Sequence, residues 1–320
     1  MKLTGPYLGK RYRTLDYFFK NKFGCKISKI SLSGPFTCPN RDGTKGTGGC
    51  IYCSGALSGD FAGNPSDSVK EQFADIRAMM DKKWHDTKYM AYFQTGTGTY
   101  ADIDTLSALY NSALECENVV ALSVATRPDC ISKECFRLLE EISKKTYLTI
   151  ELGLQTIHDK TGELINRKST YSEFLSAFGT LKSLGIDVCV HLINGLPCED
   201  VSMMNESVMA VSDLLPWSMK LHLLHVIKGT ACEKMYLDGK FRVFEQDEYV
   251  NLICDQLQLI DNRIVMQRLT GDGKRSELVA PLWSIKKFEV LNAIDWEMER
   301  RNTLQGAGLH KLTNGKGIKA

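Results

Sequence analysis

Short apolar runs alternate with longer segments of helical periodicity over most of this chain. Six runs rich in β-branched and aromatic residues predict strands at 26–32, 88–94, 118–126, 146–155, 186–195 and 219–227. Between them, apolar residues recur every three or four positions and predict helices at 68–84, 102–115, 133–145, 170–185 and 199–215. Ser66 or Asp67 is the expected N-cap of the first helix, and Gly185 is expected to end the fourth. This alternation is typical of an α/β fold with a parallel sheet.

The pattern changes after residue 230. A helix is predicted at 245–261, a strand at 264–271 and another helix near 285–300. The last residues contain Gly and Lys without apolar periodicity, so we expect a mobile end. The predicted organisation has four parts: a basic N-terminal segment (1–25), a main domain (26–235), a C-terminal extension (236–306) and a tail (307–320).

Composition narrows the class of protein. The 320 residues are 43% hydrophobic, enough for a buried core, and a net charge of +2 is too small to indicate a nucleic-acid partner by itself. No apolar run is long enough to span a bilayer, and charges interrupt the N-terminal segment where a secretion signal would lie. Eleven cysteines therefore predict reduced thiols plus a metal site in a cytoplasmic protein without a membrane partner.

Three of these cysteines lie in one glycine-rich stretch, FTCPNRDGTKGTGGCIYCS. Cys50 and Cys53 are two residues apart and can reach one metal centre, and Cys38 precedes Cys50 by eleven intervening residues. Closed zinc sites and iron–sulfur clusters usually have four protein ligands. Three thiolates therefore favour a cluster with one open iron, while a zinc site or unrelated thiols remain the alternative.

Further segments carry a family resemblance. They are YFQ at 92–94, TRPD at 126–129, ELGLQT at 151–156, HLINGLP at 191–197, LHLLHVIKGT at 221–230 and APLWS at 280–284. Together with the cysteine stretch, they resemble the YhcC/YtqA branch of the radical S-adenosylmethionine (SAM) superfamily, which is related to the radical SAM subunit of Elongator. The eleven-residue gap differs from the three residues of most members and is typical of this branch.

This resemblance implies a fold and two cofactors. The fold is a partial (β/α)6 barrel with a small C-terminal α/β extension that closes it. Cys38, Cys50 and Cys53 would hold a 4Fe–4S cluster whose open iron binds SAM. A one-electron reductant such as flavodoxin or ferredoxin would start SAM cleavage to a 5′-deoxyadenosyl radical. The cysteine stretch follows the first strand, at the strand ends where parallel barrels place their chemistry.

The resemblance also indicates candidate SAM contacts. Gln94 and Thr95 open a glycine-rich turn whose backbone N–H groups suit an anion, although a simple strand-to-helix turn is the alternative. Thr126 ends the third strand, where Arg127 and Asp129 form either an ion pair or ligand contacts. Gln155 is the candidate for the ribose, and Arg167 for the carboxylate, since guanidinium binds carboxylate as a fork. The five candidates are Gln94, Thr95, Thr126, Gln155 and Arg167.

Lys220 and His222 are the candidate catalytic residues. They share one face of the sixth strand, and cations inside a barrel are costly unless they meet an anion or an acid such as Glu151. His191, on the fifth strand, is more typical of a satisfied core residue. Cys198 is expected to be an inert buried thiol.

The resemblance implies a substrate as well: tRNA, with conversion of carboxymethylaminomethyl-uridine to aminomethyl-uridine at the wobble position. Residues 1–29 contain eight Lys or Arg, one acid and several aromatic residues, which fits RNA but equally fits a solvated helix. Two alternatives stay open. One is radical SAM chemistry on a small metabolite, and the other is a zinc-stabilised RNA-binding module without catalysis.

Overall fold

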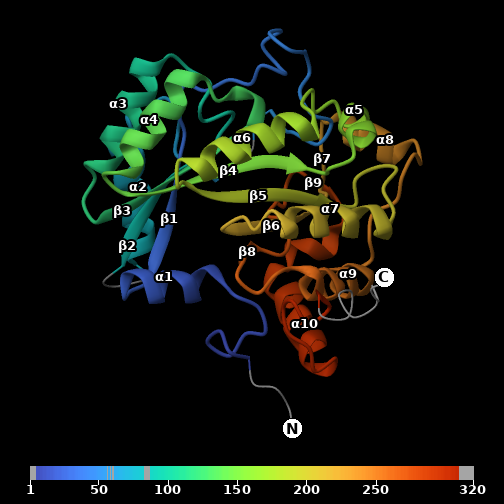
Figure 1. Cartoon of the computed structure of the whole chain (residues 1–320). Helices are drawn as coiled ribbons and strands as arrows, with labels where there is room; N and C mark the ends of the chain where they lie inside the picture. Colours follow the sequence, from blue (N-terminus) through green and yellow to red (C-terminus); the bar gives the residue numbers. More distant parts are fainter. Residues whose placement is uncertain (1–4, 56, 58, 60, 83–86, 310–320) are drawn as a thin grey trace, which may run out of the picture. The chain divides into compact units, whose positions relative to one another are not determined.

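The computed structural model describes residues 5–55, 57, 59, 61–82 and 87–309 (Figure 1). These residues divide into two compact units. The N-terminal unit contains residues 19–154 and 162–189, and the C-terminal unit contains the described parts of 1–18, 155–161 and 190–320. Within the described ranges, no helix has the length and apolar character needed to cross a membrane.

Parallel strands form the sheet of the N-terminal unit. They are β1 (Ile27–Leu32), β2 (Lys88–Phe93), β3 (Val119–Thr126) and β4 (Tyr147–Gln155), and consecutive strands pair in parallel. Every residue of β2 after Lys88 is buried, as expected for a parallel strand covered on both faces. The carboxyl ends of these strands therefore meet at one edge, where the cysteine stretch begins after β1.

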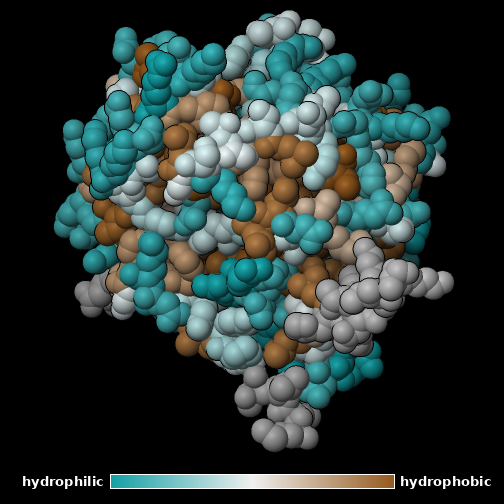
Figure 2. All heavy atoms as spheres, in the orientation of Figure 1, coloured by the Kyte–Doolittle hydropathy of each residue, from teal (hydrophilic) through white to brown (hydrophobic). Residues whose placement is uncertain are grey.

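The predicted helices connect these strands. They are α2 (Val69–Asp81), α3 (Ile103–Leu114), α4 (Lys133–Ser143) and α6 (Tyr171–Ser183), with short η1 (Pro128–Cys130) and α5 (Asp159–Leu164) between them. The helix α2 packs against β1 and α3, and α3 packs against β3 and α4. Their inner faces are apolar, whereas Figure 2 shows a mainly hydrophilic outer surface over α3 and α4. The helices are therefore ordered by burial of one face.

The helix ends test two predictions. The N-cap of α2 is Ser68, not Ser66 or Asp67. The Ser68 side chain accepts from the backbone N–H of Glu71, and the Glu71 carboxylate accepts from the backbone N–H of Ser68. This reciprocal pair satisfies two N-terminal donors, so it fixes the start. Gly185 follows the end of α6 with φ +70°, which confirms it as the helix stop.

The C-terminal unit adds a strand that the six-strand pattern did not include in the sheet. The strands β6 (Ser218–Leu223) and β8 (Val265–Arg268) pair in parallel. With β5 (Asp187–Asn194), the sheet has the order β1-β2-β3-β4-β5-β6-β8. The single strand predicted at 219–227 was wrong, because the chain changes partner. Its last part, β7 (Val226–Ile227), pairs antiparallel with β9 (Leu278–Ala280) instead.

Helices complete the C-terminal unit. They are α7 (Val201–Asp213), α8 (Ala231–Leu237), α9 (Gln246–Leu259) and α10 (Lys287–Arg300), and α9 packs against both α7 and α10. The short turn η2 (Leu282–Ile285) precedes α10. Ile253, Leu257, Ile294 and Met298 are fully buried, so this helix pair has an apolar core. The predicted tail lies outside the described residues from 310 onward.

The basic N-terminal segment contributes to the fold. Arg11 is buried and donates to the carbonyl of Thr303 at 3.2 Å. Lys10 pairs with Asp295, and Arg13 donates to the carbonyl of Arg263 at 2.9 Å. These cations therefore anchor the segment that leads into α1 (Leu15–Phe23), a helix absent from the predicted elements.

Candidate functional site

The three thiols of the cysteine stretch lie close enough to influence one another. Burial raises the pKa of Cys53 to about 11, and the neighbouring Cys50 and Cys38 add to that rise. Burial also raises the pKa of Cys50, and Cys38 adds to it. All three are free thiols, partly accessible to solvent. The three predicted ligands thus belong to one loop, and their binding of a cluster stays a prediction.

Hydrogen bonds within the loop shape its second half. The Arg41 guanidinium donates to the carbonyls of Cys53 and Ser54 at 2.7 and 2.8 Å. The backbone N–H of Cys53 donates to the carbonyl of Cys50 at 3.0 Å, closing the turn between the two cysteines. At Gly49, φ is +76° and an added Cβ would lie 2.6 Å from Arg41 Nε. Glycine is therefore required there, both for conformation and for space.

Residues 165–166, which follow α5, form hydrogen bonds with the cysteine loop. The backbone N–H of Ile51 donates to the carbonyl of Ile165 at 3.0 Å. The Asn166 side chain donates to the carbonyl of Gly49 at 2.8 Å, and Asn40 donates to the carbonyl of Asn166. Sequence reasoning did not single out Asn40, Arg41 or Asn166, since their only signal is proximity to the cysteines or to Arg167.

Arg127 and Asp129 form an ion pair, one of the two alternatives that the sequence left open. Two guanidinium nitrogens donate to the Asp129 carboxylate at 3.0 and 2.9 Å, and Lys45 Nζ lies 2.6 Å from the same group. Burial raises the pKa of Asp129, but Arg127 and Lys45 outweigh it and the net pKa is lowered. Because Lys45 belongs to the cysteine loop, the buried carboxylate holds that loop to the end of β3.

The glycine-rich turn after β2 uses its backbone donors internally. The N–H groups of Gly96, Thr97 and Gly98 donate to the carbonyls of Leu57, Thr37 and Ala125, at 2.9, 3.1 and 2.9 Å. The expectation of free donors for an anion is therefore wrong for these three positions. A Cβ on Gly98 would lie 2.7 Å from the Ala125 carbonyl oxygen. The turn is glycine-rich because it packs closely against β3.

Three of the predicted SAM contacts stand at the ends of strands in this unit. Ser31 Oγ donates to Gln94 Oε1 at 3.0 Å, and the hydroxyls of Ser33 and Thr95 are 2.9 Å apart. Thr126 Oγ1 lies 2.6 Å from the hydroxyl oxygen of Thr99. The side chains of Gln94, Thr95 and Thr126 are thus oriented by polar neighbours, and their contact with SAM stays a prediction.

Arg167 is buried rather than presented to solvent. Its guanidinium donates to the carbonyls of Leu154 and Ser169, at 2.5 and 2.8 Å. An added Cβ on Gly162 would lie 2.8 Å from Arg167 Nη2, so the side chain is closely packed. Gln155, the other predicted contact, ends β4 with φ +64°. The structure gives Arg167 a scaffolding role, and its binding of carboxylate stays a prediction.

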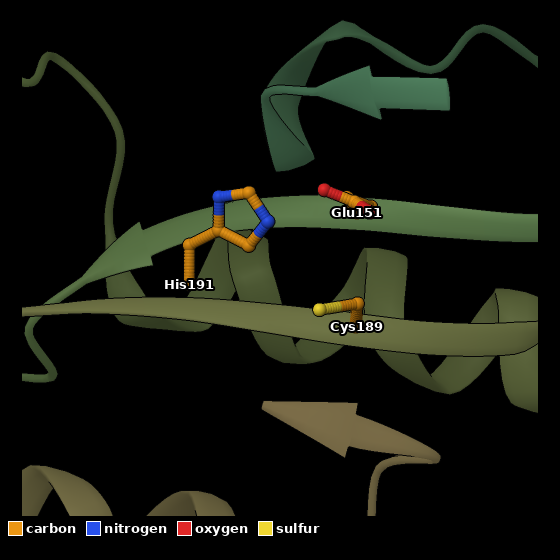
Figure 3. Close-up of side chains that lie close together, drawn as sticks. All are labelled: Glu151, Cys189 and His191. Carbon is orange, nitrogen blue, oxygen red and sulfur yellow. The ribbon is translucent and has the colours of Figure 1, made fainter. Parts of the chain in front are cut away.

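Glu151 is the central acid of the N-terminal unit. Figure 3 shows it on β4, and Cys189 and His191 on β5. Its carboxylate accepts from Lys29 Nζ at 2.6 Å, Tyr92 Oη at 2.7 Å and Ser123 Oγ at 3.1 Å. These three donors satisfy the oxygens of a carboxylate that is fully buried.

The candidate catalytic residues belong to the C-terminal unit. Lys220 is 6% exposed, and His222 lies next to His191 with 5.2 Å between ring centroids. Cys198 is exposed, with φ +67°, so the expectation of a buried thiol is wrong. It follows a proline at the end of the β5 loop, where the turn leaves its side chain in solvent. The catalytic role of Lys220 and His222 stays a prediction.

Comparisons with known proteins agree with this geometry. A model of the radical SAM superfamily matches residues 41–210, and a model of a radical SAM C-terminal domain matches residues 216–300. YtqA of Bacillus subtilis is 47% identical over 303 residues, covering 95% of this chain and 94% of YtqA. YhcC of Escherichia coli is 33% identical, covering 90% of this chain and 92% of YhcC.

More distant relatives are named for tRNA chemistry. A protein of Methanocaldococcus jannaschii named tRNA uridine(34) acetyltransferase is 25% identical, covering 75% of this chain and 50% of that protein. The solved structure of archaeal Methanocaldococcus infernus Elp3 covers 91% of this chain and 68% of that chain, with TM-score 0.67 and 19% identity. This likeness shows the predicted fold, a partial α/β barrel with a C-terminal extension.

Proposed function

Because the chain belongs to the radical SAM superfamily, whose members use a 4Fe–4S cluster and SAM, we propose that it modifies tRNA at the wobble uridine. The observation that supports tRNA as the substrate is the similarity to the tRNA uridine(34) acetyltransferase across three quarters of this chain. A second relative, archaeosine synthase subunit beta of Methanosarcina acetivorans, is 25% identical over 243 residues. The first of these names concerns tRNA, which supports an RNA rather than a metabolite substrate.

The residues present fit the cluster. Cys38, Cys50 and Cys53 offer three sulfur donors from one loop, and the raised pKa of Cys50 and Cys53 reflects burial, which disfavours the thiolates despite the opposing charges of Arg127 and Arg41. A bound metal centre compensates that charge and displaces the protons. When bound, the reduced cluster supplies the electron that cleaves SAM to a 5′-deoxyadenosyl radical. We assign SAM contacts to Gln94, Thr95, Thr126, Gln155 and Arg167.

The finer reaction is removal of the carboxymethyl group from carboxymethylaminomethyl-uridine, leaving aminomethyl-uridine. Hydrogen abstraction from the carbon beside the side-chain nitrogen would begin it. Loss of one further electron to the oxidised cluster would give an imine, and hydrolysis of its C–N bond by water would release glyoxylate and leave aminomethyl-uridine. We assign Lys220 to the substrate carboxylate and His222 to the same region, because both stand on β6 and an ammonium group binds a carboxylate by charge-assisted hydrogen bonds. The reductant is a one-electron donor of the flavodoxin or ferredoxin class, and the setting is the reducing cytoplasm.

Nucleoside analysis of tRNA tests the substrate. A strain that lacks this gene is compared with strains that express the wild-type protein or Cys50→Ser. We expect carboxymethylaminomethyl-uridine to accumulate in the deletion strain and with Cys50→Ser, and aminomethyl-uridine to return with the wild type. Unchanged wobble uridines in all strains would overturn the tRNA proposal and favour a small metabolite.

Anaerobic reconstitution tests the cofactor independently of the substrate. The wild-type protein is expected to bind iron and sulfide, to absorb visible light and to cleave SAM when reduced. A colourless protein with stoichiometric zinc would contradict the enzyme and favour the zinc-stabilised RNA-binding module.

A further inference from the structure

Asn40 is a buried amide inside the cysteine loop. Its side chain is inaccessible to solvent, although the loop from residue 42 to 48 is largely exposed. Nδ2 lies 3.8 Å from Sγ of Cys50 and also donates to the carbonyl of Asn166. An amide nitrogen has two hydrogens, so both bonds are made at once. Asn40 therefore joins a proposed cluster ligand to the segment that fastens the loop.

The orientation of this amide is determined by its surroundings. If oxygen and nitrogen were exchanged, Oδ1 would face the carbonyl oxygen of Asn166, and two acceptors would repel each other. In the orientation described, Oδ1 is buried, with no hydrogen-bond partner among the described residues. It packs closely on Gly46, where an added Cβ would lie 2.6 Å away. In this orientation, Asn40 Oδ1 accepts no hydrogen bond, whereas Asn40 Nδ2 faces the sulfur of Cys50.

Cys50 Sγ has an amide donor beside it. Asn40 Nδ2 lies 3.8 Å from this sulfur, within the range of an N–H···S hydrogen bond. An N–H donor stabilises negative charge on the sulfur that accepts from it. Reduction of a cluster adds negative charge that its sulfur ligands share, and donors to sulfur raise the reduction potential.

We propose that Asn40 is a positioning residue that raises the reduction potential of the cluster through its N–H···S bond to Cys50. The inference rests on the proposed cysteine ligands but not on the tRNA substrate. A higher reduction potential of the cluster lets a weaker one-electron donor reduce the enzyme. The loop would therefore determine which reductants suffice, in addition to holding the cluster.

Two variants separate this role from simple support of the loop. Asn40→Leu has a similar size and removes the donor to sulfur. Asn166→Gly is the matched control: glycine readily adopts the φ of +55° at this position and keeps the carbonyl that Asn40 uses. It loses only the side-chain bonds to the carbonyls of Gly49 and Thr47, at 2.8 and 3.4 Å.

The measurement is a redox titration of reconstituted protein followed by electron paramagnetic resonance. At a fixed poised potential, we expect Asn40→Leu to lower the ratio of reduced to oxidised cluster about tenfold, a shift of about 59 mV for one electron. Asn166→Gly should keep the wild-type ratio. An unchanged ratio in Asn40→Leu, or an equal fall in both variants, would overturn the proposal.

Cluster content distinguishes the remaining outcomes. Asn40→Ser is included as a smaller replacement. If both Asn40 variants lose iron while Asn166→Gly retains it, Asn40 holds the loop and the redox role is overturned. Cys50→Ser tests the ligand assignment. If this variant retains all its iron, the cysteine site itself is contradicted. If it loses iron while Asn40→Leu keeps the wild-type reduction potential, only this inference is contradicted.

Discussion

The cysteine loop (residues 38–54) and the α9–α10 pair are ordered by different forces. In the loop, polar side chains such as Asn40 and Arg41 bind backbone carbonyls and sulfur, and much of the surface is exposed. In the helix pair, apolar side chains such as Leu257 and Ile294 are fully buried. Individual hydrogen bonds contribute little net stability but specify geometry, whereas burial contributes stability.

Because of this difference, we expect substitutions in the two regions to affect different properties. A change in the loop should alter metal binding while leaving the free energy of unfolding nearly unchanged. A change in the helix pair should do the reverse. Three experiments test this separation, and one more tests the buried His225, which lies in neither region; the largest expected effect comes first.

Cys50→Ser should abolish cluster assembly. It replaces one proposed thiolate by a poor ligand and leaves two sulfurs, too few to hold the cluster. Iron and sulfide analysis after anaerobic reconstitution measures the loss, and far-ultraviolet circular dichroism of the metal-free protein checks the fold. A variant that keeps wild-type iron would show that Cys50 is no ligand. A variant that fails to fold would show that the loop contributes more stability than this comparison allows.

Ile294→Ala should destabilise the protein by about 3 kcal/mol, because it deletes a fully buried side chain and leaves a cavity between α10 and its neighbours. Urea unfolding of the metal-free protein measures the change, and iron content at low temperature should match the wild type. Trp296→Ala is the control, since this side chain on the same helix is 69% exposed. Equal destabilisation by both would contradict the assignment of α10 stability to its buried face.

His225 should make stability depend on pH. Burial lowers its pKa from 6.5 to about 4, with smaller effects from Asp272 and Arg268. The unfolded chain takes up the proton below pH 6.5, whereas the folded protein resists it until about pH 4. Stability from the neutral ring is therefore complete above pH 6.5 and falls as pH drops toward 4, by up to about 3 kcal/mol.

Urea unfolding at pH 7 and pH 4.5 measures this dependence. His225→Gln cannot take up the proton and should flatten the profile over that range. Circular dichroism of this variant at pH 7 checks that the fold is retained when the ring packed against Gly271 is replaced. The same slope in wild type and variant would assign the pH dependence to other groups.

Asp129→Asn should weaken cluster retention about tenfold, the low end of the range for residues that support metal ligands. The substitution keeps the size but removes the charge that Lys45 and Arg127 share. Release of iron to a chelator measures the effect. Glu115→Gln is the control, because its ion pair with Lys70 is exposed and remote in sequence from the loop. Equal iron release in the two variants would contradict the role of Asp129.

Much of the architecture was readable from local patterns. The strands β1 to β5 and the helices α2, α3, α4, α6, α7, α9 and α10 appear within a few residues of the predicted ranges. The cap at Ser68 was missed, although Ser68 and Glu71 have the spacing of a capping box. The division of 219–227 into β6 and β7 was not readable, because a strand pattern does not specify the partner strand.

By itself, the sequence determined the alternation of strands and helices, the closeness of Cys50 and Cys53 and the family. These depend on spacing between near neighbours, which periodicity and motifs record. Only the tertiary structure decided that Asn40 meets Cys50, that Asp129 holds Lys45 and that Arg167 is buried on backbone carbonyls. Those contacts depend on where the chain returns in space, and polar side chains with several possible partners acquire one only when folding brings it within reach.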